Sequence, residues 1–279
     1  MKNLAQNKPL LTFFLLTFLI SWGGVLILAA PYGFPTTQAK FEANYPLVFI
    51  PYLLGPLLSC LILIGLTRGK IGFRELWIRI TRWRVSIRWY AAALLAAPLL
   101  TLVLLLIFSR FSRAYLPAIF TVENPASLLL TGLMIGVFGG GLMEEPGWTG
   151  FALPRLRQRF GVFQSGIILG LIWGLWHILP TYWGSGDAAG NLSMDLLLPP
   201  LFFYLAVLPP YRMLMVWIYD GTESLLVTML MHASLTASTL FILAPDVTGK
   251  NLLLYYLILA GLLWTIVAAV IQITRRQSS

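Results

Sequence analysis

Two carboxylates and two histidines carry most of the ionisable chemistry within the apolar segments of this chain. Glu144 and Glu145 are adjacent in the stretch EEPGWTGF, which follows the apolar run LLLTGLMIGVFGGGLM. His177 and His232 are the only histidines, and each also lies within an apolar run. Because an ionisable side chain at membrane depth is costly, residues of this kind mark a functional site by default.

These residue types are suited to hydrolysis by an activated water molecule. A carboxylate and a histidine in a low-dielectric cavity can share a water and act on it as a base. His232 and Thr236, one helical turn apart, can donate hydrogen bonds to a developing oxyanion. The nucleophile pattern GxSxG is absent, and no serine or cysteine has an obvious activating partner in sequence. The sequence therefore favours water, rather than a side chain, as the nucleophile.

The spacing of these residues indicates that they can share one site. Glu144 and His177 are 33 residues apart, with the midpoint at Phe160-Gly161. In a helical hairpin turning there, both would lie at a similar depth, because each residue of a helix adds about 1.5 Å. We expect Glu144, His177 and His232 to converge in a cavity that opens toward the cytoplasm.

The composition excludes a soluble globular domain. Hydrophobic residues make up 58% of the 279 residues and charged residues only 10%, whereas soluble domains carry about 25% charged residues. A membrane-spanning helix needs about 20 apolar residues. We therefore expect an all-α, polytopic membrane helix bundle that forms a single integral membrane domain over 1–279. The lone cysteine, Cys60, excludes an intrachain disulfide and a zinc site built from cysteines.

The apolar runs and the basic residues together predict a topology. We expect eight spans at about 10–30, 46–66, 90–108, from near 127, 162–182, 196–219, 224–244 and 252–273. With both termini in the cytoplasm, 15 of the 19 lysines and arginines face the cytoplasm, as the positive-inside rule requires. The sequence thus predicts a multi-pass protein of the cell membrane with cytoplasmic ends.

Prolines, glycines and tryptophans in these spans predict local features. Pro146, Gly147 and Pro154 should break the fourth helix soon after Glu145. The run Gly139-Gly140-Gly141 should permit close helix approach. The tryptophans should act as interface anchors or packing residues.

The basic stretch over residues 67–89 predicts an amphipathic helix on an anionic membrane surface. Leu76, Ile80 and Trp83 recur at helical spacing between its arginines. The net charge of +9 then reflects cytoplasmic loops that face anionic lipid. No nucleic-acid motif accompanies the basic residues, so we expect membrane lipid, and no nucleic acid, as a partner.

Three stretches together resemble the motifs of the CPBP family of intramembrane proteases. They are EEPGWTGFALPRLRQRFG, GLIWGLWHILP and GTESLLVTMLMHASLT, within a motif-bearing core at about 127–240. The family includes type II CAAX prenyl endopeptidases and bacteriocin-processing or self-immunity proteins. Its pattern has three motifs. The first is a Glu-Glu pair followed by an arginine, the second a phenylalanine followed by a histidine, and the third a histidine followed by an asparagine or aspartate. In each motif three residues lie between the two parts.

The resemblance implies a CAAX-type intramembrane endopeptidase with assigned roles. Glu144 would activate a water with the help of His177. Glu145 would be the second acid of the pair, with a more structural role, and His232 would polarise the scissile carbonyl. The substrate would be a peptide or a prenylated or lipid-facing protein, and nothing in the chain selects one or indicates an oligomeric state.

Three positions depart from the family pattern. Thr149 stands at the arginine position, Trp173 at the phenylalanine position and Thr236 at the asparagine position. The loss of the arginine removes an ion pair to the glutamates, so we expect another cation to replace it. The candidates are Arg155, Arg157 and Arg212.

Other interpretations of the same residues stay open. A metal-free glutamate mechanism is favoured because HExxH is absent, and the alternative is zinc held by Glu144, His177 and His232. The chain could also be a catalytically weak or dead relative that acts as a membrane scaffold or immunity factor. An ion-coupled transporter with an intramembrane Glu/His relay is a third interpretation, although the sequence shows no inverted repeat.

Overall fold

The computed structural model describes residues 2–278, and the chain is helical through nearly all of them. Within this range no β-strand forms, and the only extended pairing is an isolated bridge between Gly186 and Leu192. The predicted all-α fold is confirmed. The charge pattern predicts that both ends of the chain lie in the cytoplasm. The terminal residues Met1 and Ser279 lie outside the described residues.

Eight helices of the described chain are long and apolar enough to cross a membrane. They are Pro9–Tyr32, Gln38–Thr67, Ile87–Ser109, Pro125–Leu156, Val162–Trp183, Met194–Thr222, Leu225–Ile242 and Gly249–Arg276. Each contains most of one predicted span. The prediction of a multi-pass integral membrane protein is therefore confirmed.

The spans are divided into α-helical and π-helical segments. The α-helices are α1 (Lys2–Asn7), α2 (Pro9–Ala29), α3 (Gln38–Thr67), α4 (Gly69–Ile80), α5 (Ile87–Ser109), α6 (Pro125–Met134), α7 (Leu153–Leu156), α8 (Val162–Trp176), α9 (Ile178–Trp183), α10 (Met194–Phe202), α11 (Leu208–Thr222), α12 (Leu225–Ala237) and α13 (Gly249–Ser278). The π-helical segments are η4 (Ile135–Glu144), η5 (Pro146–Ala152), η6 (Phe203–Val207) and η7 (Ser238–Ile242). Short 3₁₀ turns are η1 (Ala30–Tyr32), η2 (Arg113–Tyr115) and η3 (Ala118–Phe120).

The chain forms two compact units. The first comprises the chain up to Gly24, Ile50–Arg159 and Ile218–Val247. The second comprises Val25–Phe49, Phe160–Trp217 and the chain from Thr248. The first unit therefore holds the glutamate pair and His232, and the second holds His177.

In the first unit, glycines bring η4 close to α12. A Cβ added at Gly136 would lie 2.5 Å from the carbonyl oxygen of Ala233, and one at Gly141 would lie 2.9 Å from that of Met229. Only residues without a side chain allow two helix backbones to approach this closely. The predicted role of the glycine run is confirmed at Gly141, and this packing positions the glutamate helix against the helix that carries His232.

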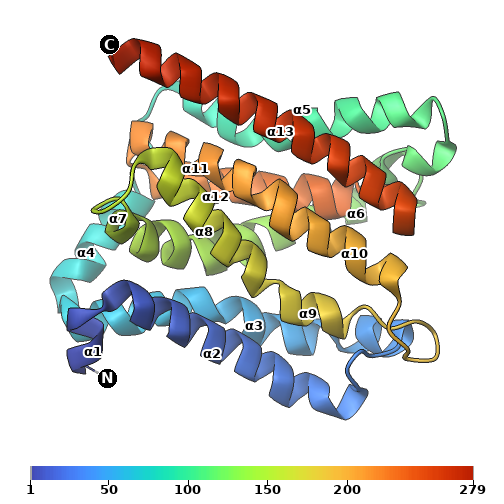
Figure 1. Cartoon of the computed structure of the whole chain (residues 1–279), viewed down its shortest axis with the longest axis horizontal. Helices are drawn as coiled ribbons and strands as arrows, with labels where there is room; N and C mark the ends of the chain where they lie inside the picture. The colour runs from blue at the N-terminus through green and yellow to red at the C-terminus, as the bar shows by residue number, and fades with distance from the viewer. Residues whose placement is uncertain (1, 279) are drawn as a thin grey trace. The chain divides into compact units, whose positions relative to one another are not determined.

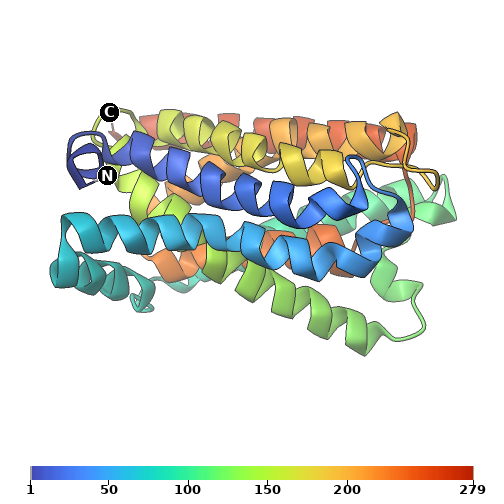
Figure 2. The same ribbon diagram turned by 90° about the horizontal axis from the view of Figure 1, so that it is seen from below.

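In the second unit, a row of glycines at every fourth position plays the same part for α8. A Cβ at Gly166 would lie 2.7 Å from the Cα of Met213, and one at Gly170 would lie 2.6 Å from the Cα of Pro209. Gly174 faces the backbone of Tyr204 in η6. In the same unit α10 lies beside α13, as Figures 1 and 2 show. The glycine row thus sets the distance between α8 and η6 one turn before His177.

The predicted amphipathic helix is shorter than the sequence pattern indicates. It occupies Gly69–Ile80 as α4, residues 81–86 are not helical, and α5 begins at Ile87. Tertiary contacts hold the intervening segment, because Arg82 accepts a hydrogen bond from the Ser224 hydroxyl and pairs with Glu223. Figure 2 shows α4 turning back at the end of α3, where Gly72 lies against Ile64.

Candidate active site

The glutamate pair lies on a helix with unusually wide turns. The prediction that Pro146, Gly147 and Pro154 break this helix is wrong, because η4, η5 and α7 form one span that continues to Leu156. In a π turn each N–H bonds to the carbonyl five residues back instead of four. Proline has no N–H and cannot make the usual α-helical hydrogen bond. The wide turns around Pro146 let the span continue past this residue. Such turns occur often at functional sites.

Glu145 is fully buried, and both its carboxylate oxygens accept hydrogen bonds. The Thr149 hydroxyl donates to Oε2 at 2.5 Å. Nδ1 of His232 lies 2.7 Å from Oε1. Because an ionised carboxylate can only accept, Nδ1 is the nitrogen that carries the proton in this pair. Glu145 thus fixes both the orientation and the tautomer of His232.

Glu144, also buried, contacts the other side of the same imidazole. Its Oε2 accepts a hydrogen bond from the Trp148 indole N–H at 3.2 Å. Its Oε1 lies 3.9 Å from Nε2 of His232. This distance is too long for a direct hydrogen bond, whereas one water molecule can bridge two polar groups at such a separation. The two glutamates therefore have different surroundings although they are neighbours in sequence.

Gly140 leaves open the space that His232 and Thr236 face. A Cβ at Gly140 would lie 2.8 Å from Nε2 of His232 and 2.8 Å from the Thr236 hydroxyl oxygen. Any side chain at this position would overlap both groups. The imidazole and the hydroxyl thus lie beside the same position of the glutamate helix, and their roles as hydrogen-bond donors stay a prediction.

His177, in the second unit, has an aromatic environment. Its Nδ1 lies 2.8 Å from the Trp173 carbonyl oxygen, and its ring stacks on Tyr204 with centroids 4.1 Å apart and planes at 12°. Trp176 meets the imidazole edge-on at 4.8 Å. A carbonyl only accepts, so Nδ1 donates, and Nε2 is the nitrogen that can take a proton in the neutral ring.

Trp173, at the phenylalanine position of the family pattern, packs against a buried cation. The Arg212 side chain is fully buried, and its guanidinium carbon lies 4.1 Å from the centroid of the Trp173 ring. Such a contact stabilises a desolvated arginine by up to about 2 kcal/mol. The tryptophan therefore supports His177 through its carbonyl and Arg212 through its ring.

A hydroxyl and an imidazole contact the Glu145 carboxylate, and replacement of the motif arginine by Arg155, Arg157 or Arg212 stays a prediction. Arg155 donates to a backbone carbonyl one turn back in its own helix at 2.6 Å, and Arg157 pairs with Asp220 at 2.8 Å. Neither of these bonds involves a motif glutamate. Thr149 instead donates to Glu145 from the arginine position itself.

The first unit brings together four of the predicted site residues. They are Glu144, Glu145, His232 and Thr236. His177 belongs to the second unit, where its partners are those described above, and its convergence with the glutamates stays a prediction.

Two contributors to the site were not predicted from the sequence. Trp148 was expected to be a packing residue, yet it donates to Glu144. Its position one helical turn after the glutamate is the signal that could have indicated this. Gly140 could not be distinguished from its glycine neighbours, because only the position of α12 shows which of them faces the histidine.

The side chains give no pattern of ligands for zinc. Within residues 2–278, no three His, Cys, Asp or Glu side chains are grouped so that they could hold a metal ion. The choice between the metal-free and the zinc mechanism stays a prediction.

Comparison with known proteins confirms the family resemblance. The sequence model described as "Type II CAAX prenyl endopeptidase Rce1-like" matches residues 125–238. A protein named CAAX prenyl protease 2 from Methanococcus maripaludis is 21% identical over 222 residues, which are 79% of this chain and 80% of that protein. All the predicted site residues lie within the matched segment.

Proposed function

We propose that this chain, a CPBP family protein by these matches, is an intramembrane endopeptidase that hydrolyses a peptide bond with a glutamate-activated water. The observation that carries the proposal is the single imidazole of His232 between two buried glutamates, at 2.7 Å from one and 3.9 Å from the other. A purely structural ion pair needs one carboxylate. The second carboxylate, at a distance suited to a water, is what hydrolysis requires.

Glu144 is the proposed base. It takes a proton from the water as the water oxygen adds to the scissile carbonyl carbon. The C–N bond then breaks, and the same proton passes to the leaving amine, so the carboxylate is regenerated. The Trp148 indole N–H holds Oε2, which leaves Oε1, the oxygen nearer to His232, for this task.

His232 and Thr236 are the proposed donors to the carbonyl oxygen. Nδ1 of His232 donates to Glu145, so Nε2 is the nitrogen that faces the substrate. A proton on Nε2 makes the ring cationic, and the Glu145 carboxylate balances that charge. The Thr236 hydroxyl faces the same space beside Gly140, so both groups can stabilise the oxyanion.

His177 assists Glu144 in this proposal, and the family resemblance is the basis for that role. The contact of Nδ1 with the Trp173 carbonyl favours the neutral imidazole that carries its proton on Nδ1. In this tautomer Nε2 can accept a proton. A proton acceptor is what a helper of the base needs.

A prenylated or otherwise lipid-facing protein is the proposed class of substrate. An apolar cavity of about 400 Å³ lies among α5, α6, η4 and α12. Leucines line much of it, and Ala233 and Ala237 belong to the lining, next in sequence to His232 and Thr236. Adjacent helical residues point about 100° apart, so α12 can present an apolar face to a lipid chain and a polar face to the peptide bond.

The site is proposed to open to the cytoplasm, with both ends of the chain on that side. Cysteines introduced at Arg275 and at Asp187, in a Cys60→Ser background, should react with a membrane-impermeant thiol reagent from opposite sides. Reaction of both from the same side would contradict the layout.

The proposed activity can be tested with the purified protein in liposomes. A peptide with an S-prenylated cysteine near its C-terminus should be cut, and mass spectrometry in ¹⁸O-labelled water should place one labelled oxygen in the new carboxylate. The His232→Ala variant should lose the activity. Cleavage that continues at the wild-type rate in this variant would contradict the assignment of the site, and no cleavage by the wild type would favour a catalytically inactive relative.

A further inference from the structure

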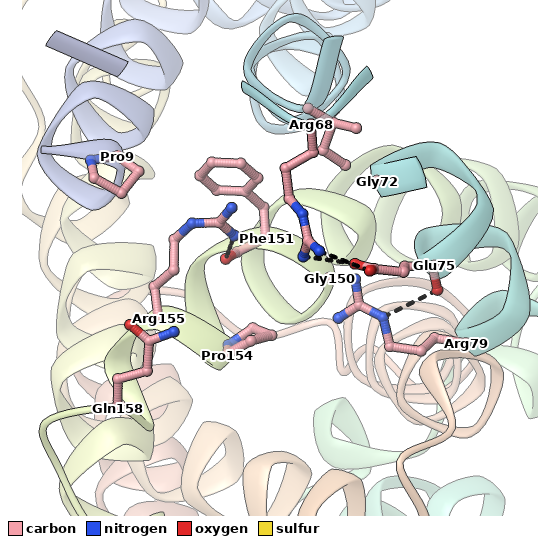
Figure 3. A pocket seen from close by; sticks show the side chains of 11 residues that line it. Pro9, Arg68, Gly72, Glu75, Arg79, Gly150, Phe151, Pro154, Arg155 and Gln158 are labelled. Atoms are coloured by element: carbon pink, nitrogen blue, oxygen red, sulfur yellow. Dashed lines mark hydrogen bonds and ion pairs between the residues drawn. The ribbon is translucent and has the colours of Figure 1, made fainter. Parts of the chain in front are cut away.

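A basic pocket lies on the glutamate helix beyond the site, and the proposed function does not use it. Its volume is about 360 Å³, and its lining includes Arg68, Glu75, Arg79, Phe151, Arg155 and Gln158. Figure 3 shows the side chains of the three arginines around the same space. Arg68 lies in the turn between α3 and α4, Arg79 in α4 and Arg155 in α7, so separate segments supply positive charge to one place.

Only one of the three positive charges is neutralised within the pocket. Arg68 contacts both carboxylate oxygens of Glu75, at 2.8 and 2.7 Å. This is the bidentate geometry in which a guanidinium and a carboxylate match best. No other acidic residue lines the pocket, so Arg79 and Arg155 leave it with an excess of positive charge.

Neutral groups hold these two arginines in place without cancelling their charge. Arg79 donates to the Glu75 backbone carbonyl at 3.3 Å and to the Tyr219 hydroxyl at 3.2 Å. Arg155 donates to the Phe151 carbonyl at 2.6 Å, and its guanidinium lies 3.5 Å from the centroid of the ring of that residue. Most of the N–H donors of both groups are not used in these bonds. The two guanidinium groups are therefore fixed and still able to bind an anion.

The three arginines also repel one another. Arg68, Arg79 and Arg155 carry like charges around one pocket, and like charges repel. An anion in the pocket would relieve this repulsion, which would otherwise oppose the packing of α4 against η5.

The depth of the pocket matches that of lipid phosphates. Pro9, in its lining, is the first residue of the first span, and Arg68 directly follows the last residue of the second. Arg155 is the next-to-last residue of the fourth span. The pocket therefore lies where spans begin and end, on the side that the charge bias predicts to face the cytoplasm. The cytoplasmic leaflet is the one that carries anionic lipids.

An adjoining cavity adds an apolar surface to the basic one. This second cavity, of about 490 Å³, shares Pro9, Arg155 and Gln158 with the first. Leu10, Leu11 and Phe14 line it together with Lys8 and Arg159. A basic wall beside an apolar wall complements a molecule with a phosphate group and a hydrocarbon part, and neither inorganic phosphate nor a peptide carboxylate has both.

We propose that this pair of cavities binds an anionic phospholipid, whose phosphate group lies between Arg79 and Arg155. The phosphate accepts the remaining N–H donors of both arginines, and the lipid chain lies along Leu10, Leu11 and Phe14. Such a lipid connects α4 to the helix that carries the glutamate pair, so it stabilises the fold around the site without a part in the chemistry.

The binding can be measured on the full-length protein delipidated in a mild detergent. Phosphatidylglycerol is titrated in, and bound lipid is counted by native mass spectrometry while the thermal unfolding temperature is recorded. The variants are Arg79→Gln and Arg155→Gln, and the matched control is Arg74→Gln, an exposed arginine of α4 outside the pocket lining. Each pocket variant should bind phosphatidylglycerol roughly fivefold more weakly, because one basic residue near an anionic surface contributes about that factor. The control should bind as the wild type does.

Further arms separate this proposal from the other sources of an anion. Phosphatidylcholine should bind the wild type more weakly and should not distinguish the variants, and inorganic phosphate should not raise the unfolding temperature. Arg155→Lys, which keeps the charge, should recover part of the affinity and controls for misfolding. Equal binding of the two lipids, an equal loss in the Arg74 control, or full stabilisation by inorganic phosphate would each overturn the proposal. It would also be overturned if the pocket variants raised KM for a peptide with a free C-terminal carboxylate, but not for its amide, while lipid binding stayed unchanged.

Discussion

The two histidines of this protein are held by chemically different partners. His232 donates from Nδ1 to the Glu145 carboxylate, whereas Nδ1 of His177 meets a backbone carbonyl and its ring stacks on Tyr204. A carboxylate balances the charge of a protonated ring, and a carbonyl fixes a tautomer without adding a negative charge. The carboxylate partner suits His232 to its proposed role as a cationic donor, and the carbonyl partner suits His177 to its proposed role as a proton acceptor.

The largest expected effect concerns the carboxylates around His232. Glu144→Gln should lower kcat about a thousandfold or more, because a general base contributes roughly 10²–10⁴ in rate. Glu145→Gln should cost less, roughly a hundredfold, because the amide NH2 replaces one of the two carboxylate oxygens and cannot accept the hydrogen bond from His232 or Thr149 that this oxygen accepts. Single-turnover cleavage of a prenylated peptide by both variants shows which substitution lowers the rate more. An equal loss, or a larger loss at Glu145, would reverse the roles of the two residues.

A methyl group in the space facing His232 should have the next largest effect. Gly140→Ala places a Cβ 2.7 Å from the imidazole, so the ring must move, and we expect kcat to fall about a hundredfold. Gly139→Ala is the matched control, because its Cβ would meet only side-chain atoms at ordinary contact distances of 3.5 Å and more. The same kinetic assay, with circular dichroism to verify folding, separates the two. If both variants kept wild-type rates, the space beside Gly140 would have no part in the reaction.

A smaller effect should follow from changing the ring beneath His177. Tyr204→Leu removes the stacked aromatic partner, and such a pair contributes about 0.5–1.5 kcal/mol. We expect kcat to fall about three- to tenfold, with KM unchanged. Tyr204→Phe keeps the ring and should be close to wild type. If the phenylalanine variant lost as much as the leucine variant, the hydroxyl rather than the stacking would matter.

The smallest effect is expected at the position where the family has an arginine. Thr149→Val removes the hydroxyl that donates to Glu145, which should lower kcat roughly fivefold, the factor of one ordinary hydrogen bond. Thr149→Ser keeps the hydroxyl and should recover most of the rate. A valine variant with the full rate would show that His232 alone is sufficient to hold Glu145.

The spans and the site residues of the first unit follow from local patterns. Runs of about 20 apolar residues gave all eight helices, because backbone groups within a bilayer must bond within their own segment. Glu145 and Thr149 are one turn apart on one helix, so their contact could be read from spacing. Their proximity to His232, which lies 87 residues after Glu145, could not be inferred from helical periodicity. It was inferred from the resemblance of the three motifs to the family pattern.

Features that depend on tertiary packing were beyond the sequence. The helix through Pro146 continues because the turns widen, and no propensity argument predicts π turns over such a length. The amphipathic pattern at residues 67–89 suggested one helix, yet the bonds of Arg82 to Ser224 and Glu223 interrupt it. The contact of the Glu145 carboxylate with the His232 imidazole depends on the packing of two helices, so spacing within one helix could not predict it.

The direction in which Glu144 and Glu145 point depends on the number of residues in η4. Each residue of an α-helix turns the chain by about 100°, and each residue of a wider π turn turns it by somewhat less. Deleting one residue before Glu144 would therefore turn both carboxylates away from α12. An insertion would rotate them the other way. Substitutions that keep the glycines facing α12 can leave the direction of the glutamates unchanged, whereas a change of length by one residue cannot.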